Sequence, residues 1–160
     1  MLMEKKLEAD VRVGDIYEKL PYLDDFFDAI ISIQTLHHNT VTKIKKLIGE
    51  MERILSNGGY ILVTVPSKMN QAEKFKLIEK GTYVPLDGRE KGLPHHFFTR
   101  QEIAELFSNF DIEEMYIDQK LILVAHALIR SNYIDEPSYK VRGCNTWLML
   151  FWLGLVSQVL

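Results

Sequence analysis

The chain has 160 residues, of which 47% are hydrophobic and 26% are charged, a composition of globular domains and not of disordered segments. Its formal net charge of -3 excludes a strongly basic protein that tracks nucleic-acid phosphates, so we expect no DNA partner. The single cysteine, Cys144, cannot form an internal disulfide, which predicts a reducing, cytoplasmic location. Residues 1–10 lack the long apolar run of a signal peptide.

The N-terminal part of the chain predicts a strand–helix–strand pattern. We expect a short strand over 10–13, a turn over 20–25 and a buried strand over 27–33. An amphipathic helix over 41–55 and a second buried strand over 59–66 are expected to follow. The helix is predicted from apolar residues at three- and four-residue spacing, and Gly58 with Gly59 is expected to end it. The last two strands and this helix make a βαβ unit, which implies parallel strands and an α/β fold.

The second half of the chain has a more mixed pattern. We expect a helix over 69–80, a loop over 81–94 and a second helix over 100–107. A hairpin of two strands over 111–117 and 121–129 is expected next, and 131–143 shows no clear pattern. Thr99 is expected to cap the second helix, with Glu102 at the capping-box position. The apolar run Trp147–Leu160 would span about 21 Å as a helix, less than the roughly 30 Å of a bilayer core, so we expect a buried helix or strand and no membrane span.

Polar residues follow three of the expected strands. Asp15 comes after the first strand, Gln34–His37 after the second and Pro66–Lys68 after the third. In open α/β sheets, ligands bind beyond the carboxyl ends of the strands, so these segments are the candidate ligand-binding edge. Asp28 lies at the opposite end of its strand, and we therefore interpret it as structural.

Three stretches of the sequence resemble a known family. GDIYEKLPYLDDFFDAIISIQTLHH at 14–38 and MERILSNGGYILVTVP at 51–66 resemble the class I S-adenosylmethionine-dependent methyltransferases of the small-domain type 11 kind. HHFFTRQEIAELFSNFDIEEMYID at 95–118 is similar to a later part of that domain. The resemblance implies a Rossmann-like fold, S-adenosylmethionine as cofactor and methyl transfer to an acceptor that is a small molecule, an RNA or a protein.

The resemblance also implies roles for individual residues. Asp15 matches the acid that accepts a hydrogen bond from the adenine amino group, and Ile16 matches its apolar neighbour against the ring. Gln34, Leu36 and His37 match the segment that lines the methionine end of the cofactor and the reaction centre. A carboxylate at a strand end suits an amino donor, which agrees with these roles.

The histidines leave several interpretations open. His37 is either a catalytic base or a hydrogen-bonded residue that lines the pocket. His95 and His96 are either turn and strand-edge residues or, by the resemblance, residues on the substrate side. Since neighbouring residues on a strand point to opposite faces, and no third ligand is near in the sequence, we expect no metal site at His37 and His38.

One motif of the family is absent from the N-terminal part of this sequence. The family's first strand is followed by a glycine-rich turn around the methionine part of the cofactor, and its second strand ends in an acid that holds the ribose. Neither precedes residue 10, so the sequence predicts an incomplete Rossmann-like fold over 1–130, with family strands 3-4-5-6-7, and an atypical apolar tail over 131–160.

The missing strands have a structural consequence. The family's strand order is 3-2-1-4-5-7-6, so the strand over 27–33 is expected to have an open edge. The apolar tail would then either cover the exposed sheet or mediate self-association. Two functions follow: a methyltransferase, or a non-catalytic methyltransferase-like fragment that associates through its sheet edge or tail.

Overall fold

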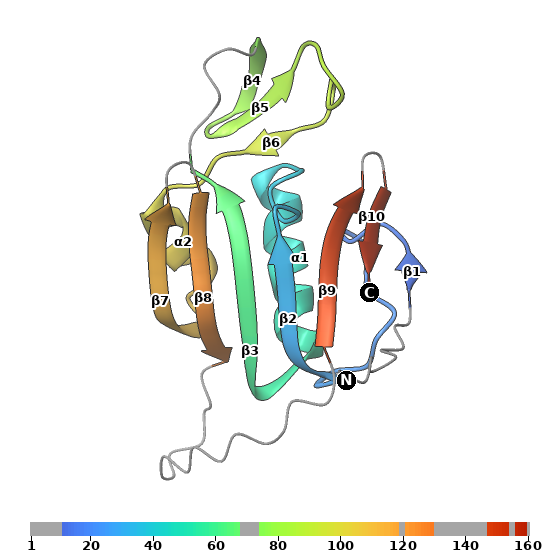
Figure 1. Ribbon diagram of the computed structural model, residues 1–160, viewed down its shortest axis with the longest axis vertical. Coiled ribbons are helices and arrows are strands. Elements are labelled where there is room, and N and C mark those ends of the chain that lie inside the picture. Colours follow the sequence, from blue (N-terminus) through green and yellow to red (C-terminus); the bar gives the residue numbers. More distant parts are fainter. Residues whose placement is uncertain (1–10, 68–73, 119–120, 130–146, 154–155, 160) are drawn as a thin grey trace, which may run out of the picture.

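The computed structural model describes residues 11–67, 74–118, 121–129, 147–153 and 156–159. Within these residues the chain forms a seven-stranded sheet in the order β1-β10-β9-β2-β3-β8-β7 and a separate three-stranded sheet, β4-β5-β6 (Figure 1). The strands of the large sheet are β1 (Arg12–Val13), β2 (Phe27–Ile33), β3 (Leu55–Pro66), β7 (Phe110–Asp118), β8 (Leu121–Ile129), β9 (Trp147–Leu153) and β10 (Val156–Val159). The small sheet consists of β4 (Phe75–Glu79), β5 (Thr82–Pro85) and β6 (His95–His96), and the helices are α1 (Val41–Ile54) and α2 (Arg100–Leu106).

The expected βαβ unit is present as β2, α1 and β3. Strands β2 and β3 are parallel and pair, for example, Ile30 with Ile61. The buried side chains of α1 follow the three- and four-residue spacing that predicts the helix, and they are Ile44, Leu47, Ile48, Met51 and Ile54. Alternate residues of β3 are buried in the same core, so one face of the strand packs against the apolar face of the helix.

Both helices lie on the same side of the large sheet, behind it in Figure 1. Helix α1 ends one residue earlier than expected, and the glycine pair does not end it. Leu55 already has an extended backbone at the C-cap, while Gly58, with φ of +75°, turns the chain inside the following segment. Among the described residues, no helix combines the length and apolar character that crossing a bilayer requires.

The two helices differ in how they begin, which gives a matched pair of cap residues. Thr99 accepts a hydrogen bond from the backbone N–H of Glu102 at 3.1 Å, whereas the side chain of Thr40 makes no cap bond at the start of α1. We expect Thr99→Ala to lower the free energy of unfolding by about 1 kcal/mol and Thr40→Ala to change it by less than about 0.5 kcal/mol. Urea denaturation of both variants tests this, and equal effects would contradict it.

The C-terminal strands occupy the positions that the family's first two strands would take. In the order 3-2-1-4-5-7-6, the strands β1, β2, β3, β8 and β7 correspond to 3, 4, 5, 7 and 6, which leaves β10 and β9 at positions 2 and 1. Strand β9 runs parallel to β2 and pairs with Ala29–Ser32, so the open edge expected for the strand over 27–33 is wrong. Of the two alternatives for the tail, this segment follows the first and covers the sheet. Strand β10 runs antiparallel to β9.

Two expectations in the middle of the chain are wrong. The helix expected over 69–80 is replaced, in its described part, by strand β4, and the loop expected over 81–94 contains β5. Gly81, with φ of +79°, supplies the turn that pairs these strands. The expected hairpin of β7 and β8 is confirmed, whereas the turn at 119–120 and the stretch at 131–143 lie outside the described residues.

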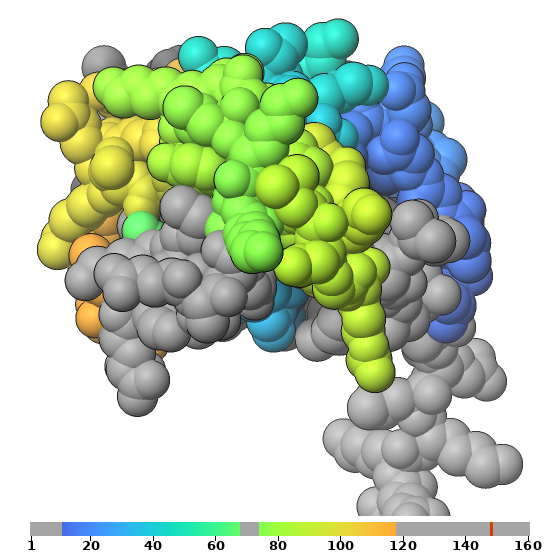
Figure 2. All heavy atoms as spheres, turned by 90° about the horizontal axis from the view of Figure 1, so that it is seen from above, coloured from blue at the N-terminus to red at the C-terminus, as the bar shows by residue number. Residues whose placement is uncertain are grey.

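The small sheet, which we call the cap sheet (β4–β6), lies over the carboxyl ends of β2 and β3 (Figure 1), and Figure 2 shows it in green and yellow-green across the molecule from above. Backbone hydrogen bonds fasten it there: Phe98 N donates to Pro66 O at 3.0 Å, and His96 N donates to His37 O at 2.8 Å. At the start of α1, Val41 N donates to the Glu79 carboxylate at 2.7 Å. The cap sheet therefore covers the expected ligand edge.

Candidate functional site

The loops after β1 and β2 are joined by a buried tyrosine. The hydroxyl of Tyr17 lies 3.1 Å from the carbonyl oxygen of Leu36 and 3.3 Å from that of Thr35, and it donates toward them. Burial raises the pKa of Tyr17, so the phenol stays protonated and remains a donor. The backbone N–H of Tyr17 in turn donates to Asp15 Oδ1 at 2.9 Å. Tyr17 therefore connects Asp15, the acid expected to bind adenine, to the segment after β2 through hydrogen bonds.

The expected cofactor residues differ in their exposure. Asp15 is exposed, whereas the side chains of Ile16 and Leu36 are fully buried in the core. Gln34 is half-buried and has φ of +52°, a left-handed conformation that is uncommon for a residue with a side chain. Its backbone N–H donates to Thr64 O at 3.0 Å, which fixes the bend where β2 ends. Asp15 and Gln34 are therefore accessible side chains of this set.

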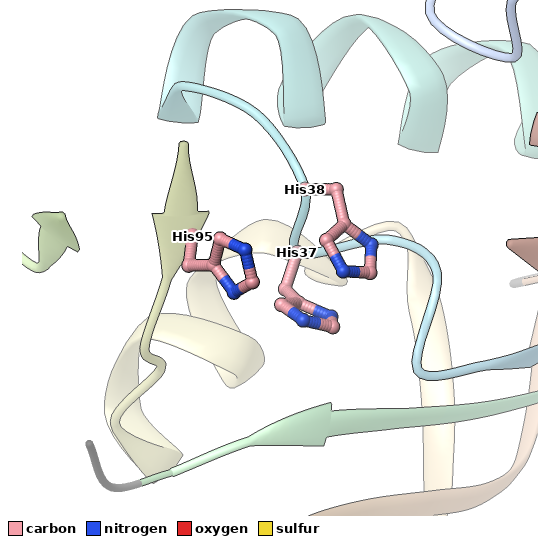
Figure 3. A group of neighbouring side chains, drawn as sticks. All are labelled: His37, His38 and His95. Atoms are coloured by element: carbon pink, nitrogen blue, oxygen red, sulfur yellow. The ribbon is translucent and has the colours of Figure 1, made fainter. Parts of the chain in front are cut away.

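Three buried histidines converge at the same edge. His37 and His38 lie in the turn after β2, His95 lies on β6, and their rings lie close together (Figure 3). The ring centroids of His37 and His38 are 3.8 Å apart, and that of His95 is 5.4 and 4.9 Å from them. The expectation that His37 and His38 diverge is wrong because they follow the strand and lie in a turn, where side chains do not alternate.

His96 lies apart from this group and is held by its own partners. Its Nδ1 lies 2.7 Å from Thr82 Oγ1 and its Nε2 lies 3.0 Å from Glu102 Oε1, and its side chain is fully buried. A Cβ added to Gly81 would lie 2.8 Å from the ring, so only glycine fits beside it. Both ring nitrogens of His96 therefore have partners, and its place on the substrate side stays a prediction.

Burial lowers the pKa of two of the converging histidines. It is the largest cause that lowers the pKa of His37 well below its ordinary value, and the neighbouring His38 and His95 add to the effect. Burial also lowers the pKa of His38 to about 4, helped by His95 and opposed by the bond to Thr35. A lowered pKa makes the imidazole of His37 a weaker proton acceptor, and its role as a catalytic base stays a prediction.

Two contributors to this edge are not evident from the sequence. Tyr17 follows the expected acid by two residues, but nothing in the local pattern predicts that its hydroxyl reaches the next loop. Glu90 lies between β5 and β6, with Oε2 at 3.3 Å from His95 Nε2 and Oε1 at 4.0 Å from His38 Nε2. Only the folding of the cap sheet brings this carboxylate to the histidines.

A hollow elsewhere on the described surface does not belong to this edge. It lies between the two helices and is lined by Val41, Lys45, Ile48, Gly49, Glu52, Glu102, Glu105, Leu106 and Asn109. Its charged residues carry both signs, and none of the expected cofactor residues lines it.

Sequence comparison relates part of the chain to known methyltransferases. Residues 2–63 match the family model described as "Methyltransferase domain". A tRNA (carboxymethyluridine(34)-5-O)-methyltransferase of Arabidopsis thaliana is 49% identical over 57 residues, which are 35% of this chain and 14% of that protein. The chain therefore matches only a small part of the length of this curated relative.

Solved structures share the fold. A SAM-dependent methyltransferase of Methanosarcina mazei superposes with a TM-score of 0.59 at 20% identity, covering 74% of this chain and 67% of that chain. The 1,6-didemethyltoxoflavin-N1-methyltransferase of Burkholderia thailandensis, solved with S-adenosylhomocysteine, gives 0.53 at 14% identity, covering 72% and 48%. At such identities the likeness establishes a Rossmann-like methyltransferase fold. In sequence and in fold, this chain thus resembles the class I S-adenosylmethionine-dependent methyltransferases.

Proposed function

We propose that this chain forms the adenine and reaction-centre side of an S-adenosylmethionine site and takes part in methyl transfer. The observation that carries the proposal is the Tyr17 bridge, which holds the loop of Asp15 against the segment that follows β2. The two segments follow the carboxyl ends of β1 and β2, which run in the same direction although β1 pairs with the antiparallel strand β10. Ligands of open α/β sheets bind at this edge. The family match over residues 2–63 includes both of them.

The residues of this edge fit one part of the cofactor. Asp15 is exposed, and its Oδ1 accepts only the backbone N–H of Tyr17 among the described residues, so the carboxylate has capacity left for an adenine amino group. Gln34 directly follows β2, and its backbone N–H donates to Thr64 of β3. No G-x-G turn occurs in the 160 residues, and β9 stands at the position of the family's first strand, so we assign no residue to the methionine cradle.

Methyl transfer requires little acid or base catalysis by the protein. The sulfonium of S-adenosylmethionine supplies the methyl group, and a nucleophile takes it in line with the leaving sulfur. The protein's contribution is to position the two reactants and exclude water, and the cap sheet above the edge suits that task. The curated relative acts on a tRNA uridine, which makes RNA the first acceptor class to test before small molecules and proteins.

Calorimetric titration with S-adenosylhomocysteine tests the proposal. We expect micromolar binding to the wild-type chain and a loss of about tenfold in affinity for Asp15→Asn, since a hydrogen bond to a charged group contributes about 1.5–3 kcal/mol. Asp25→Asn is the control, because Asp25 is exposed, has a positive φ that asparagine tolerates and lies before β2 at the opposite edge. No binding by folded wild-type protein, or an unchanged affinity in Asp15→Asn, would contradict the assignment.

The non-catalytic alternative has less support. Its association surface was the open edge of β2, but β2 is flanked by β3 and β9 in this structure. The chain is also similar in sequence to methyltransferases. Self-association through the apolar tail stays a prediction, which gel filtration at several concentrations would test.

A further inference from the structure

The three converging histidines have the arrangement of a metal site. His37, His38 and His95 each offer a ring nitrogen, and these atoms all lie within 4.8 Å of one another. Their side chains are 6%, 5% and 7% exposed, so the group is buried and comes from two separate segments of the chain (Figure 3). Bonds of 2.0–2.1 Å around a tetrahedral ion would place the ligand nitrogens roughly 3.3 Å apart, a shorter spacing that the rings would have to reach by rotating.

The backbone holds these segments in place before any ion binds. His96 N donates to His37 O at 2.8 Å, which joins β6 directly to the turn after β2. His95 pairs with Tyr83 in the cap sheet. The ligand positions are therefore set by strand pairing and backbone hydrogen bonds, which is the preorganisation that a binding site needs.

A second observation points independently to a ligand. The Nδ1 atom of His37 is buried and makes no hydrogen bond among the described residues. Buried polar atoms are nearly always paired in folded proteins, so an imidazole nitrogen in this state indicates a missing partner. His96, the next residue after His95, shows the contrast because both of its ring nitrogens are hydrogen-bonded.

The outer contacts of His38 match those of a metal ligand. Its Nδ1 lies 3.2 Å from the carbonyl oxygen of Thr35. A carbonyl only accepts, so this contact places the proton on Nδ1 and leaves the lone pair on Nε2, the nitrogen that faces Glu90. Metal-bound histidines commonly donate their second ring N–H to such a carbonyl, which fixes the tautomer and the ring orientation.

Glu90 is the carboxylate that lies against two of these histidines, next to the compact group of three. Its Oε2 lies 3.3 Å from His95 Nε2, close to the spacing of two ligand atoms on one tetrahedral ion, and its Oε1 lies 4.0 Å from His38 Nε2. We propose that His37, His38, His95 and Glu90 form a zinc site that fastens the cap sheet to the turn after β2. Three imidazoles and one carboxylate suit Zn²⁺, whereas Mg²⁺ and Ca²⁺ prefer all-oxygen sites.

The site is tested by metal binding to the chelator-stripped chain without any methyl donor, so the result does not depend on the proposed function. We expect one Zn²⁺ per chain by calorimetry and a higher melting temperature with zinc. Co²⁺ in place of zinc is expected to give the strong visible absorption of a tetrahedral site. Folded protein that takes up no zinc would overturn the proposal.

Variants distinguish this site from adventitious surface binding. We expect His95→Gln and Glu90→Gln each to weaken zinc affinity at least tenfold, the range that loss of even an outer hydrogen-bond partner produces. Asp87→Asn is the matched control, because it removes one negative charge from an exposed position in the same loop and is expected to leave affinity unchanged. Glu90 is 38% exposed, so its variant is expected to fold. Zinc affinity equal in all three variants and the wild type would overturn the proposal.

Discussion

Replacing Leu148 by alanine is expected to lower the free energy of unfolding by about 2–5 kcal/mol, the largest effect we predict for a single substitution. Leu148 is fully buried and lies on β9 opposite Ile30 of β2. The truncation removes apolar contacts where the C-terminal strand meets the βαβ core, and it leaves a cavity that this sheet cannot easily close. Urea denaturation followed by circular dichroism measures the change.

The control for Leu148 is the same chemical change on the surface. Leu77 lies on β4 and is 59% exposed, so Leu77→Ala is expected to change stability by less than about 0.5 kcal/mol.

Removing residues 147–160 altogether should have a stronger consequence, since the edge of β2 then has no partner and oligomers form. A monodisperse monomer after this deletion, or equal effects of the two leucine variants, would show that β9 does not close the sheet.

Arg53→Met is the second substitution with a large expected effect, about 2–3 kcal/mol of unfolding free energy. The guanidinium donates to the carbonyl oxygens of Leu20 at 3.2 Å and Tyr22 at 2.9 Å, and to the Glu50 carboxylate at 2.7 Å. It also donates to Asp24 at 2.7 Å, but Asp24 is 74% exposed and adds little. The side chains of Arg53 and Glu50 are only 21% and 22% exposed, so the estimate lies between values for surface and buried pairs.

The pH dependence of this effect has a definite sign. The bond from Arg53 lowers the pKa of Glu50, against the opposing influence of burial. The pair therefore stabilises the fold fully above the ordinary glutamate pKa, and this contribution is lost as pH falls through the lowered value. The difference between wild type and Arg53→Met should shrink in acid. Arg53→Lys keeps the charge but not the planar fork, so its cost should approach that of Arg53→Met, and wild-type stability in Arg53→Lys would contradict this account.

The βαβ unit was predictable because its signals are local. The run over 27–33 has the bounds of β2, since its residues are apolar or small apart from Asp28, a pattern that suits a strand covered on both faces. The stripe on α1 likewise belongs to one helical face. Thr99 and Glu102 gave the start of α2 correctly for the same reason: the cap bond joins residues three apart.

The cap sheet and the tail were not predictable in this way. Strand β4 has an exposed middle and no apolar alternation, so its conformation comes from pairing with β5 and not from its own pattern. The place of β9 depends on which strand edge is open, and that is a property of the whole sheet. The histidine group shows the same limit: adjacency of His37 and His38 was visible, whereas His95 and Glu90 join them only through the folded cap sheet.

The pairing of Ala29 with Trp147 bears on how this chain folds. One neighbour of β2 in the sheet is β3, which follows it closely in the sequence after α1. The other neighbour is β9, which is separated from β2 by most of the chain. Contacts of such high sequence separation form slowly, because a long loop must close before they contribute. During synthesis, β2 and β3 emerge well before β9, so the nascent βαβ unit exposes the edge of β2 for that interval. We expect that the longer β9 takes to pair with β2, the more the chain depends on chaperones and the more it aggregates in vivo.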